Sequence, residues 1–282
     1  MELIRSFLFA PGSNSNVMQK ALKAGADAVI FDLEDAVAVT EKVKARDLVF
    51  EEIRKGPFEC KRYVRINAWG TSWAREDLLA AVEGGIDGVM MPKAENSDDV
   101  NAVAAMIPAD VDFIPLVETA RGILNAFEIA SSNAKISRLA FGAVDFTLDV
   151  GATYSKTGLE LLYARSCLVI ASRAADLYPP IDTVYPDLTD LNGLESELSQ
   201  IKTIGMFGKL AIHPKQLNLI HHTFTPTESE VEIAQKITSA FEESEKIGCA
   251  SMRVDGKFVD YPVFLKAQQI ISLAEYLRHK NP

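Results

Sequence analysis

Eight short apolar runs, separated by amphipathic stretches, are the feature that most limits the fold of this chain. The runs are Ser6–Ala10, Ala28–Leu33, Tyr63–Asn67, Gly88–Pro92, Phe113–Glu118, Arg138–Gly142, Ile181–Tyr185 and Lys209–His213. They are rich in Val, Ile, Phe and Leu and are bounded by Gly, Pro, Asn or Asp, which is typical of buried strands. Strands that alternate with helices predict a parallel sheet, and eight is the number that closes an α/β barrel.

The spacing of the middle runs supports this prediction. Arg65 and Pro92 are 27 residues apart, Pro92 and Glu118 are 26 apart, and Glu118 and Asp145 are 27 apart. Each interval has the length of one strand and one helix. A chain of 282 residues, 48% of them hydrophobic, can also fill a single large core. We therefore predict an α/β fold, a (β/α)8 TIM barrel that forms the catalytic domain over residues 1–225.

The pattern changes after the last run. Pro226–Lys246 is predicted to form a long charged helix, Ala250–Val259 a β-hairpin, and Pro262–His279 a final helix. Residues 226–282 exceed what a barrel requires. We expect this helical and hairpin extension to pack on a neighbouring subunit or to fold over the site.

Charge and cysteine content exclude several classes of function. The chain has 29 Lys and Arg against 39 Asp and Glu, a net charge of −10, and no basic run. This disfavours binding to nucleic acid or to an anionic membrane, although a local cationic cluster could still hold a small anion. Three widely spaced cysteines without a CxxC pair, and the lack of a signal-peptide or membrane-spanning run, predict a cytoplasmic protein.

Polar side chains follow the ends of four of the runs. These residues are Asp32, Glu34, Asp35, Arg65, Glu118 and Asp145. Barrel enzymes place their chemistry at the C-terminal ends of the strands, so five carboxylates and one guanidinium are expected at one mouth. Carboxylates at such short separations repel one another unless they are protonated or bridged by a cation. For any single residue, a role as a strand-end cap or in a surface salt bridge remains an alternative.

Glu118 and Asp145, on adjacent strand ends, suit a hard cation such as Mg²⁺, which takes one or two carboxylates and completes its shell with water and substrate oxygens. Glu34 and Asp35, with Asp32, are predicted to support this site from outside the ligand shell. The planar guanidinium of Arg65 matches a substrate carboxylate.

The same residues carry a family resemblance. The segments concerned are Phe7–Gly12, Phe31–Val37, Val64–Asn67, Met91–Lys93, Glu118–Gly122, Gly142–Phe146, Leu162–Ser166, Asp182–Tyr185, Gly208–Pro214 and Gly256–Pro262. Together they resemble the citrate lyase β-subunit and malyl-CoA lyase family over nearly the whole chain. The resemblance implies a Mg²⁺-dependent (β/α)8 barrel that assembles as trimers or multiples of them. It implies cleavage or Claisen-type formation of a C–C bond in a β-hydroxyacyl thioester.

The resemblance also implies roles for individual residues. Glu118 and Asp145 match the metal ligands, and Arg65 matches the arginine that binds the keto-acid end and stabilises the enolate. Asp260, in the C-terminal extension, matches an aspartate that crosses to a neighbouring subunit's site as an acid or base.

Four further residues are predicted to bind substrate or cofactor. Arg5 and Lys20 flank the first loop, where the family binds the phosphates of coenzyme A. Gly142 ends the sixth run and Ala143 follows it, two residues before Asp145. Backbone N–H groups at the start of the helix after Pro11–Asn16 could hold a phosphate, although a simple helix cap explains that loop as well.

The predicted activity is a lyase that cleaves a CoA ester such as citramalyl-CoA or malyl-CoA to acetyl-CoA and a 2-keto acid. One alternative is a citrate lyase β-subunit that cleaves a citryl group on an acyl-carrier protein to oxaloacetate and an acetyl carrier. Glu118-Thr119-Ala120 departs from the Glu-Ser-Pro of that subunit. Two further alternatives to the lyase are a malyl-CoA-type thioesterase and a non-catalytic protein that binds CoA esters.

Overall fold

Parallel strands form the centre of the computed structural model, which describes residues 3–246 and 248–280. The strands are β1 (Ser6–Pro11), β2 (Ala28–Asp32), β3 (Lys61–Arg65), β4 (Gly88–Met91), β5 (Asp112–Val117), β6 (Ala140–Phe141) and β7 (Lys209–Ala211). They form one sheet in the order β6-β5-β4-β3-β2-β1-β7, in which all neighbours pair in parallel. All C-terminal ends therefore lie at one edge of the sheet.

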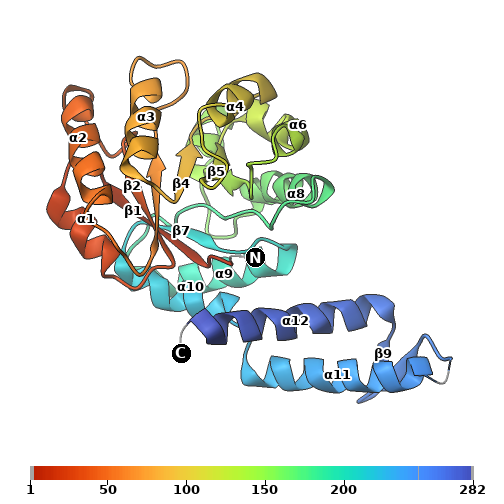
Figure 1. The fold of residues 1–282 in the computed structure, drawn as a ribbon. Helices are drawn as coiled ribbons and strands as arrows, with labels where there is room; N and C mark the ends of the chain where they lie inside the picture. Colours follow the sequence, from red (N-terminus) through yellow and green to blue (C-terminus); the bar gives the residue numbers. More distant parts are fainter. Residues whose placement is uncertain (1–2, 247, 281–282) are drawn as a thin grey trace. The chain divides into compact units, whose positions relative to one another are not determined.

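Helices follow the strands along the chain and lie outside the sheet (Figure 1). They are α1 (Ser15–Leu22), α2 (Lys42–Ile53), α3 (Ala74–Gly84), α4 (Ser97–Ala104), α5 (Ala120–Leu124), α6 (Ala126–Ser131), α7 (Ala143–Val150), α8 (Leu159–Ala174), α9 (Leu191–Ile204) and α10 (Leu217–Phe224), with 3-10 turns η1 (Val39–Glu41) and η2 (Pro214–Gln216). The α/β fold of TIM-barrel type is thus present within residues 4–220, one compact unit of the chain.

The strand predicted over Ile181–Tyr185 is reduced to two bridging residues. Ile181 forms a parallel bridge with Ala140 in β6, and Asp182 forms one with Lys209 in β7. The N–H of Phe141 donates to the Ile181 carbonyl (2.9 Å), and the N–H of Leu210 donates to the Asp182 carbonyl (2.8 Å). Prolines at 179, 180 and 186 flank this segment and lack the N–H that a longer ladder needs, which explains its shortness.

Side chains from the seven strands and the bridging segment fill the space that they surround. This interior cluster consists of Ile4, Phe7, Ala28, Ile30, Tyr63, Met90, Ile114, Leu116, Ala140, Ile181 and Leu210, with Phe9 and Val184 packed against it. The ring of Tyr63 lies so close to β4 that a Cβ on Gly88 would come within 2.1 Å of it. Because the interior is packed, a ligand site belongs at an end of the strands rather than inside.

The second compact unit contains residues 221–246 and 248–280 of the described chain. It contains α11 (Glu228–Lys246), an antiparallel pair β8 (Met252–Val254) and β9 (Lys257–Val259), and α12 (Tyr261–Lys280). Phe241, Val259 and Phe264 form its small core, with the rings of Phe241 and Phe264 stacked at 4.6 Å. The helix, hairpin and helix predicted from the sequence are therefore present. The site or subunit on which they pack stays a prediction.

Among the described residues, no helix is both long and apolar enough to cross a membrane. The three cysteines, Cys60, Cys167 and Cys249, carry free thiols.

A buried ionic network lies where the bridging segment meets its neighbours. Asp182, which is fully buried, accepts hydrogen bonds from Arg165 Nε (2.7 Å) and Lys209 Nζ (2.6 Å). Glu197 on α9 accepts from Lys209 Nζ (2.6 Å) and lies 3.1 Å from Arg165 NH2. Burial alone would raise the pKa of Asp182, but Lys209 and Arg165 lower it. Two cations and two anions thus balance one another and hold a segment in which only two residues form backbone bridges to the sheet.

Removing one charge from this network tests its contribution to stability. Asp182→Asn leaves two buried cations facing one carboxylate, so we expect the free energy of unfolding to fall by about 3–5 kcal/mol. Urea denaturation measures this change. As a control, Glu41→Gln breaks the exposed Lys44–Glu41 pair and is expected to cost less than about 1 kcal/mol. Equal effects of the two substitutions would contradict a stabilising role for the network.

Candidate active site

A cavity of about 400 Å³ lies at the C-terminal ends of the strands. The residues that line it come from or directly follow β1, β2, β3, β5, β6, β7 and the bridging segment: Phe9, Pro11, Asp32, Asp35, Ala36, Arg65, Leu116, Glu118, Gly142, Val144, Asp145, Thr183, Val184, Leu210 and Ile212. Most of the predicted site residues are therefore together on one cavity, at the edge where the parallel register places them.

Asp32 and Arg65 form the fixed base of this site. They are opposite one another in the register of β2 and β3. Arg65 donates from Nε and NH2 to the two oxygens of Asp32, both at 2.7 Å, and its guanidinium lies 4.8 Å from the ring centre of Phe9. The sequence predicted that this fork binds a substrate carboxylate. Nε and NH2 instead bind Asp32, and NH1 faces the carboxylates of Glu34 (3.2 Å) and Asp35 (3.6 Å).

The loop after β2 is shaped by the same aspartate. Asp32 accepts hydrogen bonds from the N–H groups of Glu34 (2.9 Å) and Ala36 (3.0 Å). The buried Lys42 ammonium donates to the carbonyls of Leu33 (2.8 Å) and Glu34 (2.6 Å). These bonds fix a tight turn that directs Glu34 toward Arg65, whose NH1 lies 3.2 Å from Glu34 Oε2. Burial raises the pKa of Glu34, although Arg65 opposes the shift.

Glu118 directly follows β5 and is 1% exposed. Gly142 makes room for it, because a Cβ at position 142 would lie 2.3 Å from Glu118 Oε2. Burial and the nearby carboxylate of Glu34 raise the pKa of Glu118 to about 8, against the effect of Lys93. Asp145 is not at the end of a strand. It lies in the first turn of α7, whose Ala143 N–H donates to Thr183 Oγ1 (2.9 Å).

Lys93 belongs to the Met91–Lys93 segment of the family resemblance, but the sequence predicted no role for it. It follows β4, and its Nζ lies 2.8 Å from Glu34 Oε1, 3.9 Å from Glu118 Oε1 and 3.6 Å from Asp145 Oδ1. Its backbone N–H also donates to Glu118 Oε1 (2.9 Å). Polar residues at the C-terminal ends of barrel strands face the mouth, and this holds for β4 as well. Lys93 could therefore have been predicted as a site residue.

The charges at this edge do not balance. Five carboxyl groups (Asp32, Glu34, Asp35, Glu118 and Asp145) face three cationic side chains (Lys42, Arg65 and Lys93), which leaves a formal charge of −2. The buried Oε2 of Glu34 accepts no hydrogen bond of good geometry and has only the ion pair with Arg65 NH1 at 3.2 Å. An excess of oxygen ligands with two uncompensated charges fits one hard divalent cation.

The sequence predicts two metal ligands from the protein, Glu118 and Asp145. In the part of the chain that the structure describes, no group of three or more His, Cys, Asp or Glu side chains is arranged to hold a metal. Two carboxylates agree with a magnesium ion that takes its remaining ligands from water and substrate. They do not agree with a metal enclosed by protein ligands alone.

Three predicted residues, Arg5, Lys20 and Asp260, are not among the residues that line the cavity. Arg5 precedes β1 at the opposite, N-terminal edge of the sheet, where its buried guanidinium pairs with Asp27 (2.9 Å). This position does not fit a role in binding coenzyme A at the cavity. Lys20 is exposed on α1, which Asn14 caps by accepting the N–H of Val17 (3.2 Å). Asp260 belongs to the second unit, where it accepts the N–H of Val263 (3.2 Å) at the start of α12.

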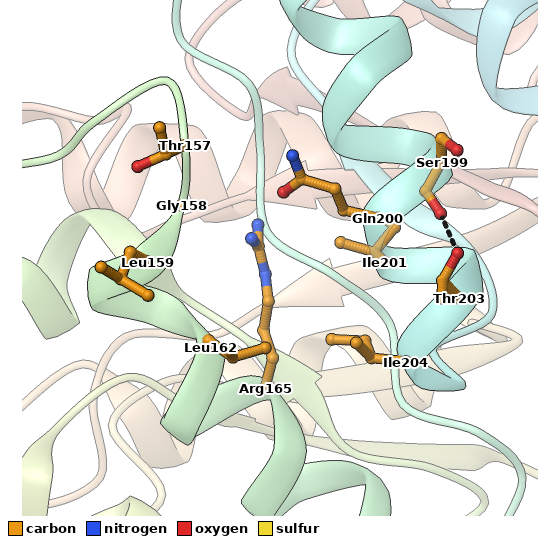
Figure 2. A pocket seen from close by; sticks show the side chains of 10 residues that line it. All are labelled: Thr157, Gly158, Leu159, Leu162, Arg165, Ser199, Gln200, Ile201, Thr203 and Ile204. Atoms are coloured by element: carbon orange, nitrogen blue, oxygen red, sulfur yellow. Dashed lines mark hydrogen bonds between the residues drawn. The ribbon is translucent and has the colours of Figure 1, made fainter.

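A second cavity, of about 350 Å³, lies between α8 and α9 and carries no carboxylate among its lining residues. Figure 2 shows Arg165 extending between the two helices, with Leu162 and Ile201 among its neighbours. Since Asp182 and Glu197 already neutralise this arginine, the cavity offers little charge to a ligand. The carboxylate-lined cavity is the better candidate for chemistry.

The raised pKa of Glu118 predicts a pH-dependent stability when divalent cations are removed. Between about pH 5 and pH 8 the folded protein keeps a proton on Glu118 that the unfolded chain has lost, so the free energy of unfolding should fall as pH rises. Urea titrations in EDTA measure this slope. Glu118→Gln should reduce the slope, whereas Glu195→Gln on the exposed side of α9 should leave it unchanged. A slope that is the same in all three proteins would contradict the assignment.

Two family models match the chain. The HpcH/HpaI aldolase/citrate lyase model covers residues 5–214, and a model for C–C bond lyases of the TIM-barrel fold covers residues 164–276. The (3S)-malyl-CoA thioesterase of Cereibacter sphaeroides is 38% identical over 272 residues, which span 96% of this chain and 94% of the relative. The citrate lyase β-subunit of Leuconostoc mesenteroides is 35% identical over 283 residues, which span 96% and 93%.

A solved structure is similar over the same extent. CitE of Mycobacterium tuberculosis, determined in complex with magnesium, acetoacetate and coenzyme A, superposes with a TM-score of 0.82 at 30% identity. The match covers 96% of this chain and 97% of CitE. With the carboxylate-lined cavity at the C-terminal edge of the sheet, these similarities show that the chain is an enzyme of the HpcH/HpaI aldolase/citrate lyase family, a family of C–C lyases.

Proposed function

We propose that this protein is a Mg²⁺-dependent lyase that cleaves the C–C bond of a short β-hydroxyacyl-CoA, such as malyl-CoA or citramalyl-CoA, to acetyl-CoA and a 2-keto acid. The observation that carries the proposal is the meeting of Glu118, Asp145 and Arg65 on one cavity, whose acidic and basic side chains sum to a formal charge of −2. The magnesium, acetoacetate and coenzyme A bound to CitE, and the malyl-CoA in the name of the thioesterase, supply the substrate class.

Glu118 and Asp145 are the residues proposed to hold the cation, with Glu34 and Asp35 beside them. When bound, a magnesium ion lowers the pKa of a substrate hydroxyl and offsets the negative charge that develops during cleavage. The substrate is expected to supply the remaining oxygen ligands, as its hydroxyl and carboxylate can do.

Arg65 is proposed to stabilise the enolate of the thioester. Asp32 accepts from Nε and NH2, so the guanidinium is oriented before substrate arrives, and NH1, now near Glu34 and Asp35, is the nitrogen that does not bind Asp32. Such a fixed donor stabilises developing charge without reorganisation. Buried among Asp32, Glu34 and Glu118, Arg65 has a raised pKa and stays cationic throughout.

Asp260 is proposed to donate the proton that converts the enolate carbon to a methyl group, acting in the site of a neighbouring subunit of a trimer. In the balanced reaction the substrate hydroxyl loses one proton to solvent, the enolate carbon gains one from Asp260, and solvent then reprotonates Asp260. The full eight-membered (β/α)8 ring and a cytoplasmic location, which fits the free thiols, belong to the same proposal.

Hydrolysis of the same thioester is a second candidate function. It is favoured by one observation: the malyl-CoA thioesterase is as similar to this chain as the citrate lyase β-subunit is. Product analysis separates the two, since a lyase yields acetyl-CoA and keto acid while a thioesterase yields free CoA and the hydroxy acid. A citryl group on a carrier protein is a third substrate for the same assay.

The test is a panel of malyl, citramalyl and citryl thioesters incubated with purified protein and magnesium. Release of glyoxylate, pyruvate or oxaloacetate together with the acetyl thioester supports the lyase. Release of free CoA without keto acid supports hydrolysis instead. No turnover of any thioester, with or without a carrier protein, would contradict both.

Asp145→Ala should lower Mg²⁺-dependent turnover by about a thousandfold or more, because one of two proposed metal ligands is lost. Steady-state kinetics across magnesium concentrations measure this loss. Asp47→Ala, which removes an exposed carboxylate from α2, serves as the matched control and should leave turnover within about twofold of the wild type. Full activity of the Asp145 variant would show that this residue does not hold the metal.

Asp260→Asn should lower turnover while leaving the affinity for magnesium unchanged, because Asp260 is not a proposed metal ligand. If it acts across a subunit boundary, refolding Asp260→Asn with an equal amount of Arg65→Ala restores intact sites. Random mixing in a trimer predicts roughly a quarter of wild-type activity. Each variant refolded alone is the control, and a mixture no more active than these controls would rule out action between subunits.

A further inference from the structure

The ammonium of Lys93 lies within 4 Å of both carboxylates proposed to hold the cation. Its Nζ is 3.6 Å from Asp145 Oδ1 and 3.9 Å from Glu118 Oε1. A metal that binds these two oxygens directly requires distances near 2.1 Å to each. The space between Glu118 and Asp145 is therefore shared by two candidate cations, one of them part of the chain.

The shortest contact of Lys93 is with a different residue. Nζ donates to Glu34 Oε1 at 2.8 Å, so its strongest hydrogen bond does not involve the proposed ligands. The side chain is 38% exposed, and its four-carbon stem gives it freedom to move. Lys93 can therefore leave Glu118 and Asp145 and keep its bond to Glu34.

The backbone at Lys93 is held independently of the side chain. Its φ of 51° is in the left-handed region, which is unfavourable for a residue with a Cβ, and its N–H donates to Glu118 Oε1 at 2.9 Å. This bond orients the carboxylate of Glu118 whichever way the Lys93 side chain points. The geometry at Glu118 can thus survive the departure of the ammonium.

We propose that Lys93 is an internal counter-ion that stands between Glu118 and Asp145 in the metal-free protein and must withdraw toward Glu34 when magnesium binds. This inference rests on the metal site of the proposed function. It assigns two opposite effects to one side chain: Lys93 stabilises the empty site, and it weakens the binding of magnesium by competing for the same carboxylates.

Neutral substitutions of Lys93 test both effects by direct binding. Isothermal titration calorimetry with MgCl₂, without substrate and at pH 9 where the carboxyl groups are largely ionised, gives the Kd for wild type, Lys93→Met and Lys93→Gln. Removing a positive charge this close to the cation should tighten binding roughly tenfold or more. Lys93→Arg, which keeps the charge, should bind magnesium about as the wild type does.

Thermal unfolding provides the second readout. In EDTA the two neutral variants should melt below the wild type, and saturating magnesium should raise their Tm by more than it raises that of the wild type. The matched control is Lys156→Met, which removes an exposed lysine paired with Asp190 and should change neither the Kd nor the magnesium-dependent shift.

The outcomes separate the two proposals. If the wild type binds magnesium and both neutral variants bind it equally or more weakly, the counter-ion role is wrong and the metal site stands. If no protein in the series binds magnesium, the metal site is wrong and the counter-ion role falls with it. Tighter binding by Lys93→Met and Lys93→Gln, but not by Lys93→Arg, supports the inference.

Discussion

Gathering five carboxyl groups around one cavity costs free energy, because like charges repel and burial removes the water that would stabilise them. The structure offsets this cost in stages. Arg65 forms a two-point ion pair with Asp32, Lys42 binds the loop that carries Glu34, and Lys93 contacts Glu34, Glu118 and Asp145. The negative charge that is left over defines what the cavity can bind, which is a cation and the oxygens that accompany it.

Two kinds of chemistry are compatible with such a site, and the relatives are named for both. A thioesterase and a lyase subunit resemble this chain to nearly the same degree over nearly its whole length. In the proposed function, both reactions begin with a thioester held near a cation and a fixed donor such as Arg65. They differ in whether water attacks the thioester carbonyl or the C–C bond breaks, so contacts around the acyl group decide between them.

The sequence predicted most of the fold because buried parallel strands are recognisable as short apolar runs, and because parallel strands all end at one edge. Those two facts were enough to bring Asp32, Arg65 and Glu118 together. They failed where the local chain departs from a regular strand. Flanking prolines shorten the segment at Ile181, and α7 begins early enough to include Asp145. The pairing of Arg65 with Asp32 and the placement of Lys93 depend on side-chain contacts between strands, which spacing along one chain does not reveal.

Thr183 follows the two bridging residues, and its hydroxyl accepts the N–H of Ala143 at the first turn of α7. The bridging segment is thereby tethered to the helix that carries Asp145. Asp182, next to Thr183, is held by Arg165 and Lys209, so a disturbance of that buried network would reach the helix of Asp145 through a single hydrogen bond.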